Sequence, residues 1–224
     1  MAIFSAFKKY REGEELSAGI LSNASAFEFK EAYNSLVNNI LHLPLGDSCK
    51  KIAVTSSAYG EGKSSLAINL ALSLASNLID KKILLVDADM RTPHIKAFLN
   101  SEIKEQGNAG LSDFLAGAKA DDCFCNSHVG NLDVVYSGLE NANPASLLNS
   151  EKMNEFISKC ESMYDYVIID TPPVSLVSDA VSLAVHVDGY LISAKSNFST
   201  VPMISKAEDA VLSVGATVLG VVLA

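Results

Sequence analysis

Short runs of β-branched and aliphatic residues alternate with helical stretches along most of this chain. The runs cover residues 52–55, 83–86, 132–136, 166–169, 190–194 and 218–223. Each run is mostly apolar, which is typical of strands that are buried on both faces. Strands that alternate with helices form a parallel sheet with helices packed on it. The pattern therefore predicts an α/β fold with a mainly parallel sheet covered by helices on both faces.

The segments between the runs are predicted helices. The first covers 26–43, where apolar residues recur every three or four positions, and it ends before Pro44 and Gly46. The later helices are predicted from about Lys63, after Pro93, through Met153 and Ile157, over 180–184 and over 202–214. Residues 1–26 lack such periodicity, so we expect a mobile N-terminal segment followed by a single domain over 27–224.

The charge balance restricts what the chain binds. Its net charge is −9, which argues against a protein that grips a nucleic-acid backbone. Because the overall charge is negative, any phosphate that the chain binds must be held by a local binding motif. Hydrophobic residues make up 49% of the chain and charged residues 19%, so the chain is able to bury a sizeable core.

Compartment is indicated by the apolar stretches and the cysteines. The longest apolar stretch, 66–79, is interrupted by polar residues and is too short to span a bilayer, and the first residues do not have the order of a secretory signal. The sparse cysteines are expected to be reduced thiols of a cytoplasmic protein. Cys123, Cys125 and His128 could supply part of a zinc site, but no fourth ligand lies nearby in sequence, so we predict a solvated loop there.

A glycine-rich motif follows the first strand. Residues 57–65 match G-x-x-x-x-G-K-[S/T], with Ser57 in place of the first glycine. In such a loop successive backbone N–H groups surround a phosphate, the lysine reaches the β- and γ-phosphates, and the next hydroxyl ligates Mg²⁺. A glycine-rich turn with a solvated lysine is the alternative. The candidate nucleotide-binding residues are Ser57, Tyr59, Gly60, Glu61, Gly62, Lys63, Ser64 and Ser65.

Two other strands end in acidic residues. Asp87 and Asp89 follow the run over 83–86, and Asp170 ends the run over 166–169. Carboxylates at these places suit Mg²⁺ ligation and proton acceptance from a hydroxyl, although each acid alone also fits an ordinary acidic turn. Ligands of such sheets bind beyond the carboxyl ends of the strands. The three motifs together predict the fold of a P-loop nucleoside triphosphatase.

The same motifs carry a family resemblance. S-S-A-Y-G-E-G-K-S-S, I-L-L-V-D-A-D-M-R-T-P and Y-D-Y-V-I-I-D-T-P-P closely resemble the Walker A, Walker A′ and Walker B sequences of the bacterial protein-tyrosine kinases (BY-kinases) of capsule and exopolysaccharide systems. The likeness spans roughly residues 27–223. It implies a kinase that depends on ATP and Mg²⁺ and phosphorylates tyrosines, mainly its own or those of a neighbouring subunit, and so regulates polysaccharide synthesis and export.

The resemblance also implies roles for individual residues. Lys63 would bind the β- and γ-phosphates, and Ser64 would ligate Mg²⁺. Asp87 and Asp89 would supply metal ligation and the base for the tyrosine hydroxyl, and Asp170 would be the Walker B acid. The expected catalytic residues are therefore Lys63, Asp87, Asp89 and Asp170, and the expected metal ligands are Ser64, Asp87 and Asp170.

Partners follow from the resemblance as well. A membrane-embedded polysaccharide co-polymerase adaptor would activate the chain and hold it at the inner face of the plasma membrane. A homo-oligomer would phosphorylate itself in trans, and a cognate tyrosine phosphatase would reverse the reaction. No nucleic acid is expected as a partner.

Three features depart from the family pattern. The N-terminal helix of the family carries E-x-x-R-x-x-R for subunit contacts, whereas here Glu31 is followed by Asn34 and Val37. The family also has a tyrosine-rich tail, whereas the tyrosines here are scattered, and Tyr166 is predicted to belong to a buried strand. The third departure is Ala224, which stands where the family often has an asparagine that helps to hold the nucleotide base.

Two other functions remain open at the level of sequence. Partitioning ATPases of the MinD and ParA kind share the Walker motifs, but they use a second lysine five residues before the main one, where this chain has Ala58. A regulator that binds ATP without transferring its phosphoryl group would use the same residues as a kinase.

Overall fold

A single mixed sheet organises the chain in the computed structural model, which describes residues 3–5, 20–22, 25–45, 48–99, 109–119, 122–139 and 143–224. The sheet has eight strands in the order β1-β8-β7-β2-β6-β3-β5-β4. The strands are β1 (Ile3–Ser5), β2 (Lys50–Ser56), β3 (Ile83–Asp87), β4 (Phe124–Asn126), β5 (Leu132–Val135), β6 (Tyr166–Asp170), β7 (Gly189–Ala194) and β8 (Val218–Leu223). Every pairing is parallel except that between β4 and β5. The predicted mainly parallel sheet is confirmed.

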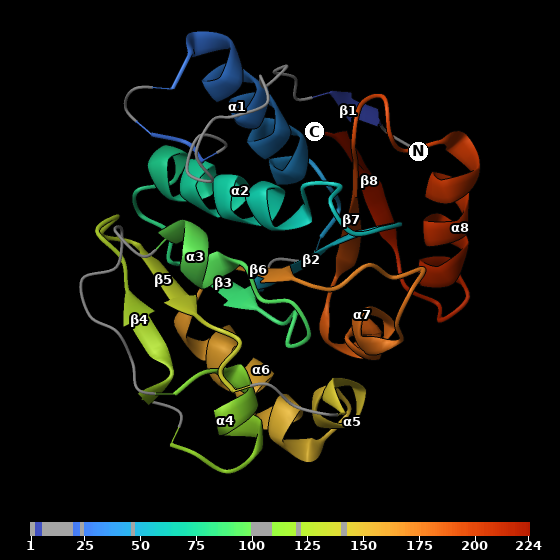
Figure 1. Ribbon diagram of the computed structural model, residues 1–224. Helices are drawn as coiled ribbons and strands as arrows, with labels where there is room; N and C mark the ends of the chain where they lie inside the picture. The colour runs from blue at the N-terminus through green and yellow to red at the C-terminus, as the bar shows by residue number, and fades with distance from the viewer. Residues whose placement is uncertain are drawn as a thin grey trace.

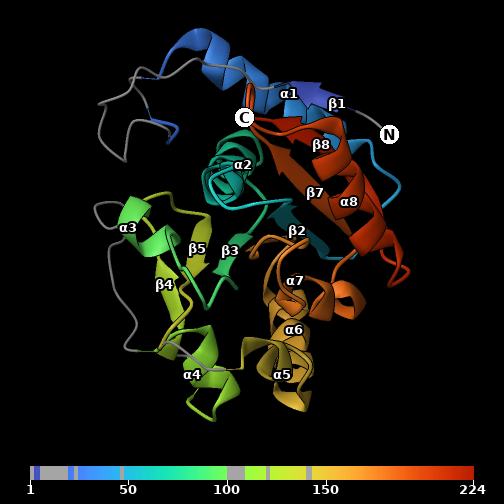
Figure 2. The same cartoon turned by 45° about the vertical axis from the view of Figure 1, so that its right-hand side comes forward.

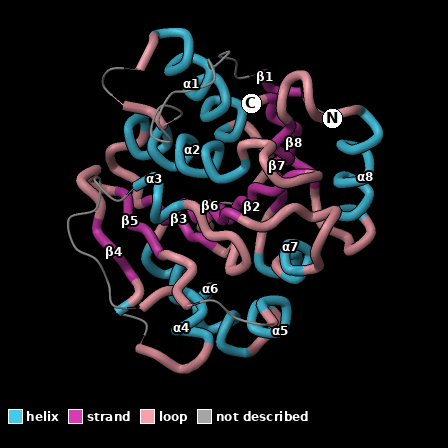
Figure 3. Tube along the Cα trace, viewed as in Figure 1, coloured by secondary structure: helices cyan, strands magenta, loops and turns pink. Residues whose placement is uncertain are grey.

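Helices cover both faces of this sheet (Figure 1). The helices α1 (Phe27–Leu41), α2 (Lys63–Asn77) and α3 (Ile95–Leu99) pack on one face. The opposite face carries α4 (Leu111–Leu115), α5 (Pro144–Leu148), α6 (Glu151–Met163), α7 (Asp179–Ser182), the 3-10 turn Ala184–His186 and α8 (Val201–Leu212). Figure 3 shows the strands as the middle layer between these two sets of helices. The predicted covering of both faces is confirmed.

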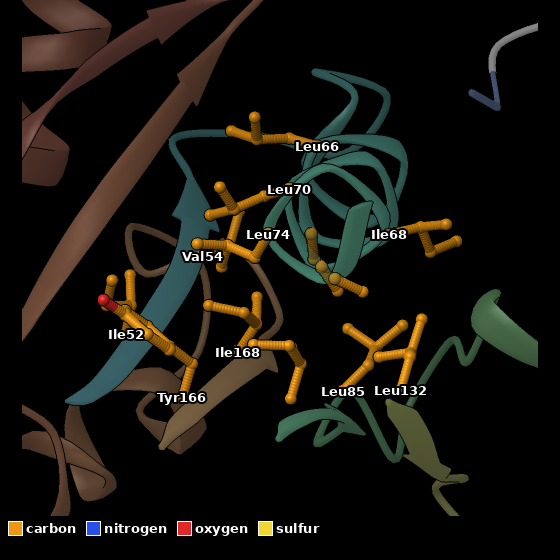
Figure 4. Close-up of a cluster of buried hydrophobic side chains, with 14 of the residues drawn as sticks. Ile52, Val54, Leu66, Ile68, Leu70, Leu74, Leu85, Leu132, Tyr166 and Ile168 are labelled. Atoms are coloured by element: carbon orange, nitrogen blue, oxygen red, sulfur yellow. The ribbon is translucent and has the colours of Figure 1, made fainter. Parts of the chain in front are cut away.

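The core on the first face forms where α2 crosses the centre of the sheet. Leu66, Leu70 and Leu74 recur at four-residue spacing along α2, and they face Val54 of β2 and Ile168 of β6 (Figure 4). All of these side chains are fully buried. Burial of one such leucine stabilises the fold by about 1.5–3 kcal/mol. This packing fixes the start of α2 against the carboxyl ends of β2 and β6.

The segment around the paired cysteines differs from its prediction. Phe124–Asn126 form β4, which pairs antiparallel with β5, and the thiols of Cys123 and Cys125 are buried. The solvated loop predicted here is therefore wrong, because these cysteines act as small apolar residues at the sheet edge. Within the described residues no group of three or more His, Cys, Asp or Glu side chains is arranged to hold a metal ion.

The first 26 residues lie largely outside the described part of the chain. The exceptions include Ile3–Ser5, which pair parallel with Val221–Leu223 of β8 as strand β1. The prediction of a mobile segment otherwise falls on residues that the structure does not describe. Among the described residues, none of the helices combines the length and the apolar character needed to cross a membrane.

Candidate active site

The loop between β2 and α2 has the backbone shape of a phosphate cradle. Gly60 and Gly62 adopt φ angles of +79° and +80°, which residues with a side chain rarely adopt. No hydrogen bond within the described residues uses the backbone N–H groups of Gly60, Glu61 and Gly62. These donors stand at the N-terminus of the 15-residue helix α2, whose dipole also favours an anion. The geometry matches the predicted phosphate-binding loop.

A buried glutamate holds this loop in shape. The Glu61 side chain is only 1% exposed, and its carboxylate accepts hydrogen bonds from the Ser57 hydroxyl at 2.9 Å and from the Ala58 backbone N–H at 2.7 Å. The Ser199 hydroxyl, which precedes α8, donates to the same carboxylate. The Ser193 hydroxyl at the end of β7 donates to the Glu61 carbonyl at 2.5 Å. Glu61 therefore ties the phosphate loop to the carboxyl end of β7 and the turn beyond it.

This arrangement explains the departure of Ser57 from the motif. Its hydroxyl bonds the Glu61 carboxylate across the loop, which a glycine at position 57 could not do. Both side chains were candidates for nucleotide binding, and the structure shows them bonded to each other. Ser57 and Glu61 would therefore contact a phosphate through their backbone N–H groups. Ser193 and Ser199 were missed because they lie more than 130 residues away in sequence.

The remaining candidates for nucleotide binding lie at the tip of the loop and in the first turn of α2. Tyr59 is 46% exposed at the tip of the loop, between Ala58 and Gly60. Ser64 and Ser65 lie in the first turn of α2, with Ser64 buried beside Lys63. The Lys63 ammonium lies 3.5 Å from the Ser64 hydroxyl. A hydroxyl at this place next to acidic side chains is a suitable ligand for Mg²⁺.

The predicted acidic residues meet beside Lys63. Asp87 and Asp170 end the neighbouring strands β3 and β6 and are register partners in the sheet. Asp89 lies two residues beyond β3, and its carboxylate forms an ion pair with the Lys63 ammonium at 2.8 Å. All three carboxylates are fully buried. The structure thus brings together four side chains that the sequence places in three separate motifs.

The three carboxylates differ in how they are bonded. Asp89 pairs with Lys63 and accepts from the backbone N–H of Thr92 at 3.0 Å. Asp87 accepts longer bonds from the backbone N–H groups of Asp89 and Ile95, at 3.2 and 3.3 Å. Among the residues that the structure describes, neither oxygen of Asp170 accepts a hydrogen bond of normal geometry, although the Ser64 hydroxyl lies close enough to lower its pKa. A buried carboxylate without a partner is costly unless a cation completes its surroundings.

The electrostatics of the cluster agree with this picture. Burial, together with the charges of Asp170 and Asp89, raises the pKa of Asp87 well above its ordinary value. Burial also raises the pKa of Asp170 to about 6, although Lys63 and Ser64 partly offset the effect. Burial acts to lower the pKa of Lys63, but Asp170 and Asp89 outweigh it and raise that pKa. The single positive charge of Lys63 therefore does not balance the charge of three ionised carboxylates.

The donor set fits a hard divalent cation. The Asp170 oxygens, the Asp87 carboxylate and the Ser64 hydroxyl are all oxygen ligands, which Mg²⁺ prefers. A divalent cation would favour the charged form of each carboxylate. The residues present thus fit the predicted metal ligands Ser64, Asp87 and Asp170.

The loop after β3 is anchored by a second buried acid. The Arg91 guanidinium donates two hydrogen bonds to the carboxylate of Asp179, at 2.6 and 3.0 Å, and Asp179 is fully buried at the start of α7. Paired bonds of this kind fix the orientation of both side chains. They hold the loop that carries Asp89 against α7. The contact was missed because the residues are 88 positions apart in sequence.

The structure also shows where the residues that depart from the family pattern lie. The amide of Asn34 donates to Glu31 and accepts from Asn77 of α2, and Val37 is buried, so this face of α1 packs within the chain. Tyr166 is buried in β6, as predicted. Ala224 lies beside the loop, since a Cβ placed on Gly62 would stand 3.4 Å from its Cβ.

Comparisons with known proteins show the family to which the chain belongs. The model of the AAA domain family matches residues 49–206, from before the phosphate loop to within α8. The tyrosine-protein kinase CpsD of Streptococcus pneumoniae serotype 4 is 36% identical over 87% of this chain and 83% of its own length. The chain belongs to the bacterial tyrosine-protein kinases. Another member, YwqD of Bacillus subtilis, is 34% identical over 86% of this chain and 79% of its own length.

Longer and structural relatives extend the comparison. The tyrosine-protein kinase wzc of Salmonella typhi is 29% identical over 96% of this chain, which corresponds to 29% of wzc. The crystal structure of the chimerical protein CapA2B2 has a TM-score of 0.86 and 29% identity, and the match covers 99% of this chain and 93% of that one. MinD of Pyrococcus horikoshii, solved with Mg-ADP, has a TM-score of 0.64 at 20% identity over 78% of this chain and 70% of its own, which shows a shared fold.

Proposed function

We propose that this chain is a protein-tyrosine kinase that uses ATP and Mg²⁺ and that regulates the synthesis and export of a capsular or extracellular polysaccharide. The observation that carries the proposal is the buried cluster of Asp87, Asp89 and Asp170 beside Lys63 of the phosphate loop. The loop and the cluster together place phosphate-binding N–H groups, oxygen ligands for a cation and a carboxylate base next to one another. Membership of the tyrosine-protein kinase family supplies the acceptor, a tyrosine hydroxyl.

Each residue has a part in this reaction. The β- and γ-phosphates of ATP lie against the N–H groups of Gly60, Glu61 and Gly62, and the Lys63 ammonium leaves Asp89 to bind them. Ser64, Asp87 and Asp170 would hold Mg²⁺, and the ion would supply positive charge to balance that of the phosphates. Asp87 or Asp89 accepts the proton of the tyrosine hydroxyl.

The proposal includes a partner and a place in the cell. A membrane-embedded co-polymerase adaptor activates the chain and holds it at the cytoplasmic face of the membrane. The relation to wzc supports this, because the kinase region there is part of a much longer chain. Phosphorylation occurs on the chain itself or on a second copy, and a tyrosine phosphatase removes it.

The test is transfer of labelled phosphate to tyrosine. The chain, with its native C-terminus and a piece of its adaptor, is incubated with Mg²⁺ and ATP labelled at the γ-phosphate. Phosphotyrosine should form and should be absent from the Lys63→Met variant. Absence of phosphotyrosine from the native chain would overturn the kinase assignment.

The same assay separates the other two functions. Nucleotide binding without phosphotyrosine or hydrolysis would favour the silent regulator. ATP hydrolysis stimulated by anionic lipid alone would favour a partitioning ATPase. Against that class, the position of its second lysine is Ala58, whose backbone N–H is held by Glu61.

A further inference from the structure

The order of the strands tells where an acceptor must approach. Along the carboxyl edge of the sheet, the phosphate loop follows β2, Asp170 ends β6, Asp87 ends β3, and β5 comes next. In phosphoryl transfer the attacking oxygen and the leaving oxygen lie roughly in line on opposite sides of the phosphorus. Because the leaving ADP is held at the β2 side, the acceptor must enter from the side of β3 and β5.

A cavity lies on that side. Its volume is about 630 Å³, and it opens between α3, the turn after β5 and the start of α4. Figure 2 shows α3 beside β5, with α4 below them. Val86 of β3 pairs with Val135 of β5, so the next residues along the two strands are Asp87 and Tyr136. The cavity is lined by Pro93, Lys96, Ala97, Ala109, Gly110, Asp113, Tyr136, Ser137, Gly138 and Leu139.

Tyr136 lines the cavity and directly follows Val135, whose register partner Val86 precedes Asp87. The Tyr136 side chain is 7% exposed, and its hydroxyl is buried without a hydrogen-bond partner among the described residues. Burial raises the pKa of this hydroxyl to about 12, and Asp87 contributes to the rise. An unpartnered buried hydroxyl costs free energy unless a ligand or water satisfies it.

The cavity wall carries two charged side chains, the acid Asp113 and the cation Lys96. The Lys96 ammonium lies 5.8 Å from the centre of the Tyr136 ring, on the exposed face of α3. One oxygen of the wall acid, Asp113, accepts a hydrogen bond from the Gly110 backbone N–H at 2.7 Å. Pro93, Ala97 and the 75% exposed Leu139 add an apolar rim. The cavity thus presents one cation and an aromatic ring to a ligand.

The floor of the cavity is tightly packed. A Cβ placed on Gly110 would stand 2.2 Å from the backbone nitrogen of Gly138, and Gly138 has a φ angle of +82°. The backbones of the two loops therefore touch, which fixes the turn after β5 against α4. This preformed shape is suited to binding an extended segment of chain.

We propose that this cavity is the acceptor site, and that it binds a tyrosine-bearing polypeptide segment with acidic residues next to the tyrosine. This inference rests on the proposed kinase function. The acceptor ring packs against Pro93 and Tyr136, and Lys96 attracts the neighbouring acidic residues. A bond then forms between the acceptor phenol oxygen and the γ-phosphorus while the bond to the β–γ bridging oxygen breaks. The electron pair of that bond leaves with ADP, and the phenol proton passes to the carboxylate of Asp87 or Asp89.

The experiment uses a random copolymer of glutamate and tyrosine as the acceptor. Lys96→Glu reverses the positive charge of the cavity wall, and Ala97→Trp fills its rim. Each should raise the KM for the copolymer by about tenfold or more, which corresponds to a loss of about 1.4 kcal/mol in binding. Binding of a fluorescent ADP analogue should change less than about twofold, since the variants lie beyond the phosphate loop.

Matched controls are available on α8. Lys206→Glu makes the same charge reversal and Ser205→Trp a similar enlargement at exposed positions of that helix, and both should leave the KM for the copolymer unchanged. Normal KM values in both cavity variants would overturn the acceptor site while leaving the kinase assignment intact. Absence of phosphotyrosine from the native chain would overturn the kinase assignment itself. Because Lys96 is exposed, Lys96→Glu should fold even if Ala97→Trp does not.

Discussion

The phosphate loop and the acid cluster lie side by side, but they differ in how their carboxylates are hydrogen-bonded. In the loop, the Glu61 carboxylate is fully used by Ser57, Ala58 and Ser199. In the cluster, the Asp170 carboxylate accepts no hydrogen bond of normal geometry from the described part of the chain, and the pKa values of Asp87 and Asp170 are raised. The loop is therefore shaped before any nucleotide binds. We propose that a divalent cation balances the charge of the cluster, so that the loop binds the nucleotide and the cluster serves the chemistry.

The largest effect is expected when the cluster loses a charge. Asp87→Asn and Asp89→Asn should each lower phosphoryl transfer by about a hundredfold or more, as is usual for lost acid-base or electrostatic groups. The measurement is the initial rate of phosphotyrosine formation with saturating ATP. The control is Asp209→Asn on the exposed face of α8, which should keep the native rate. Near-native rates in both cluster variants would show that these acids do not act in the transfer.

A smaller effect is expected when the loop loses its internal carboxylate. Glu61→Ala leaves the Ser57 hydroxyl and the Ala58 N–H without their acceptor, which costs about 1–3 kcal/mol of stability. A loosened loop should raise the KM for ATP by about tenfold and change kcat less. Urea unfolding and steady-state kinetics measure the two quantities. Glu61→Gln, which keeps one acceptor oxygen, should lie between the native chain and the alanine variant.

The control for that prediction is Glu155→Ala at an exposed position of α6. It removes only a surface ion pair with Lys152, worth about 0–1 kcal/mol. If Glu61→Ala had as little effect on ATP binding as Glu155→Ala, the loop would not depend on its carboxylate for shape.

The smallest effect is expected at Ser57. Ser57→Gly restores the ordinary motif residue and removes one hydrogen bond to Glu61, which should cost about 0.5–1.5 kcal/mol of stability. The KM for ATP should rise no more than about threefold, because the Ala58 N–H still bonds Glu61. Ser57→Ala removes the same hydroxyl without adding backbone freedom, so the pair separates the two causes. A gain of stability in both variants would contradict the role assigned to the hydroxyl.

The sequence predicted the central sheet well because its strands are mostly apolar. β2, β3, β6, β7 and β8 begin and end within two residues of their predicted bounds. β4 was missed because it is short and lies at the edge, so Cys125 and Asn126 show no apolar run. Edge strands of this kind depend on pairing with a neighbour more than on their own sequence.

The site was predictable only in part for a related reason. Lys63, Asp87 and Asp170 could be placed together because parallel strands end along one edge. The ion pair of Lys63 with Asp89, the bonds of Ser193 and Ser199 to Glu61, and the pairing of Arg91 with Asp179 depend on side-chain directions in loops. Such contacts join residues far apart in sequence, and no local pattern marks them.

The division between loop and cluster is tested most directly by the affinity for ADP, measured calorimetrically with Mg²⁺ and with a chelator. In the native chain Mg²⁺ should tighten ADP binding by about tenfold or more, whereas Asp170→Asn should bind ADP as the native chain does with chelator and gain little from Mg²⁺. A full Mg²⁺ effect in Asp170→Asn would contradict the account. So would the loss of ADP binding in that variant when Mg²⁺ is absent.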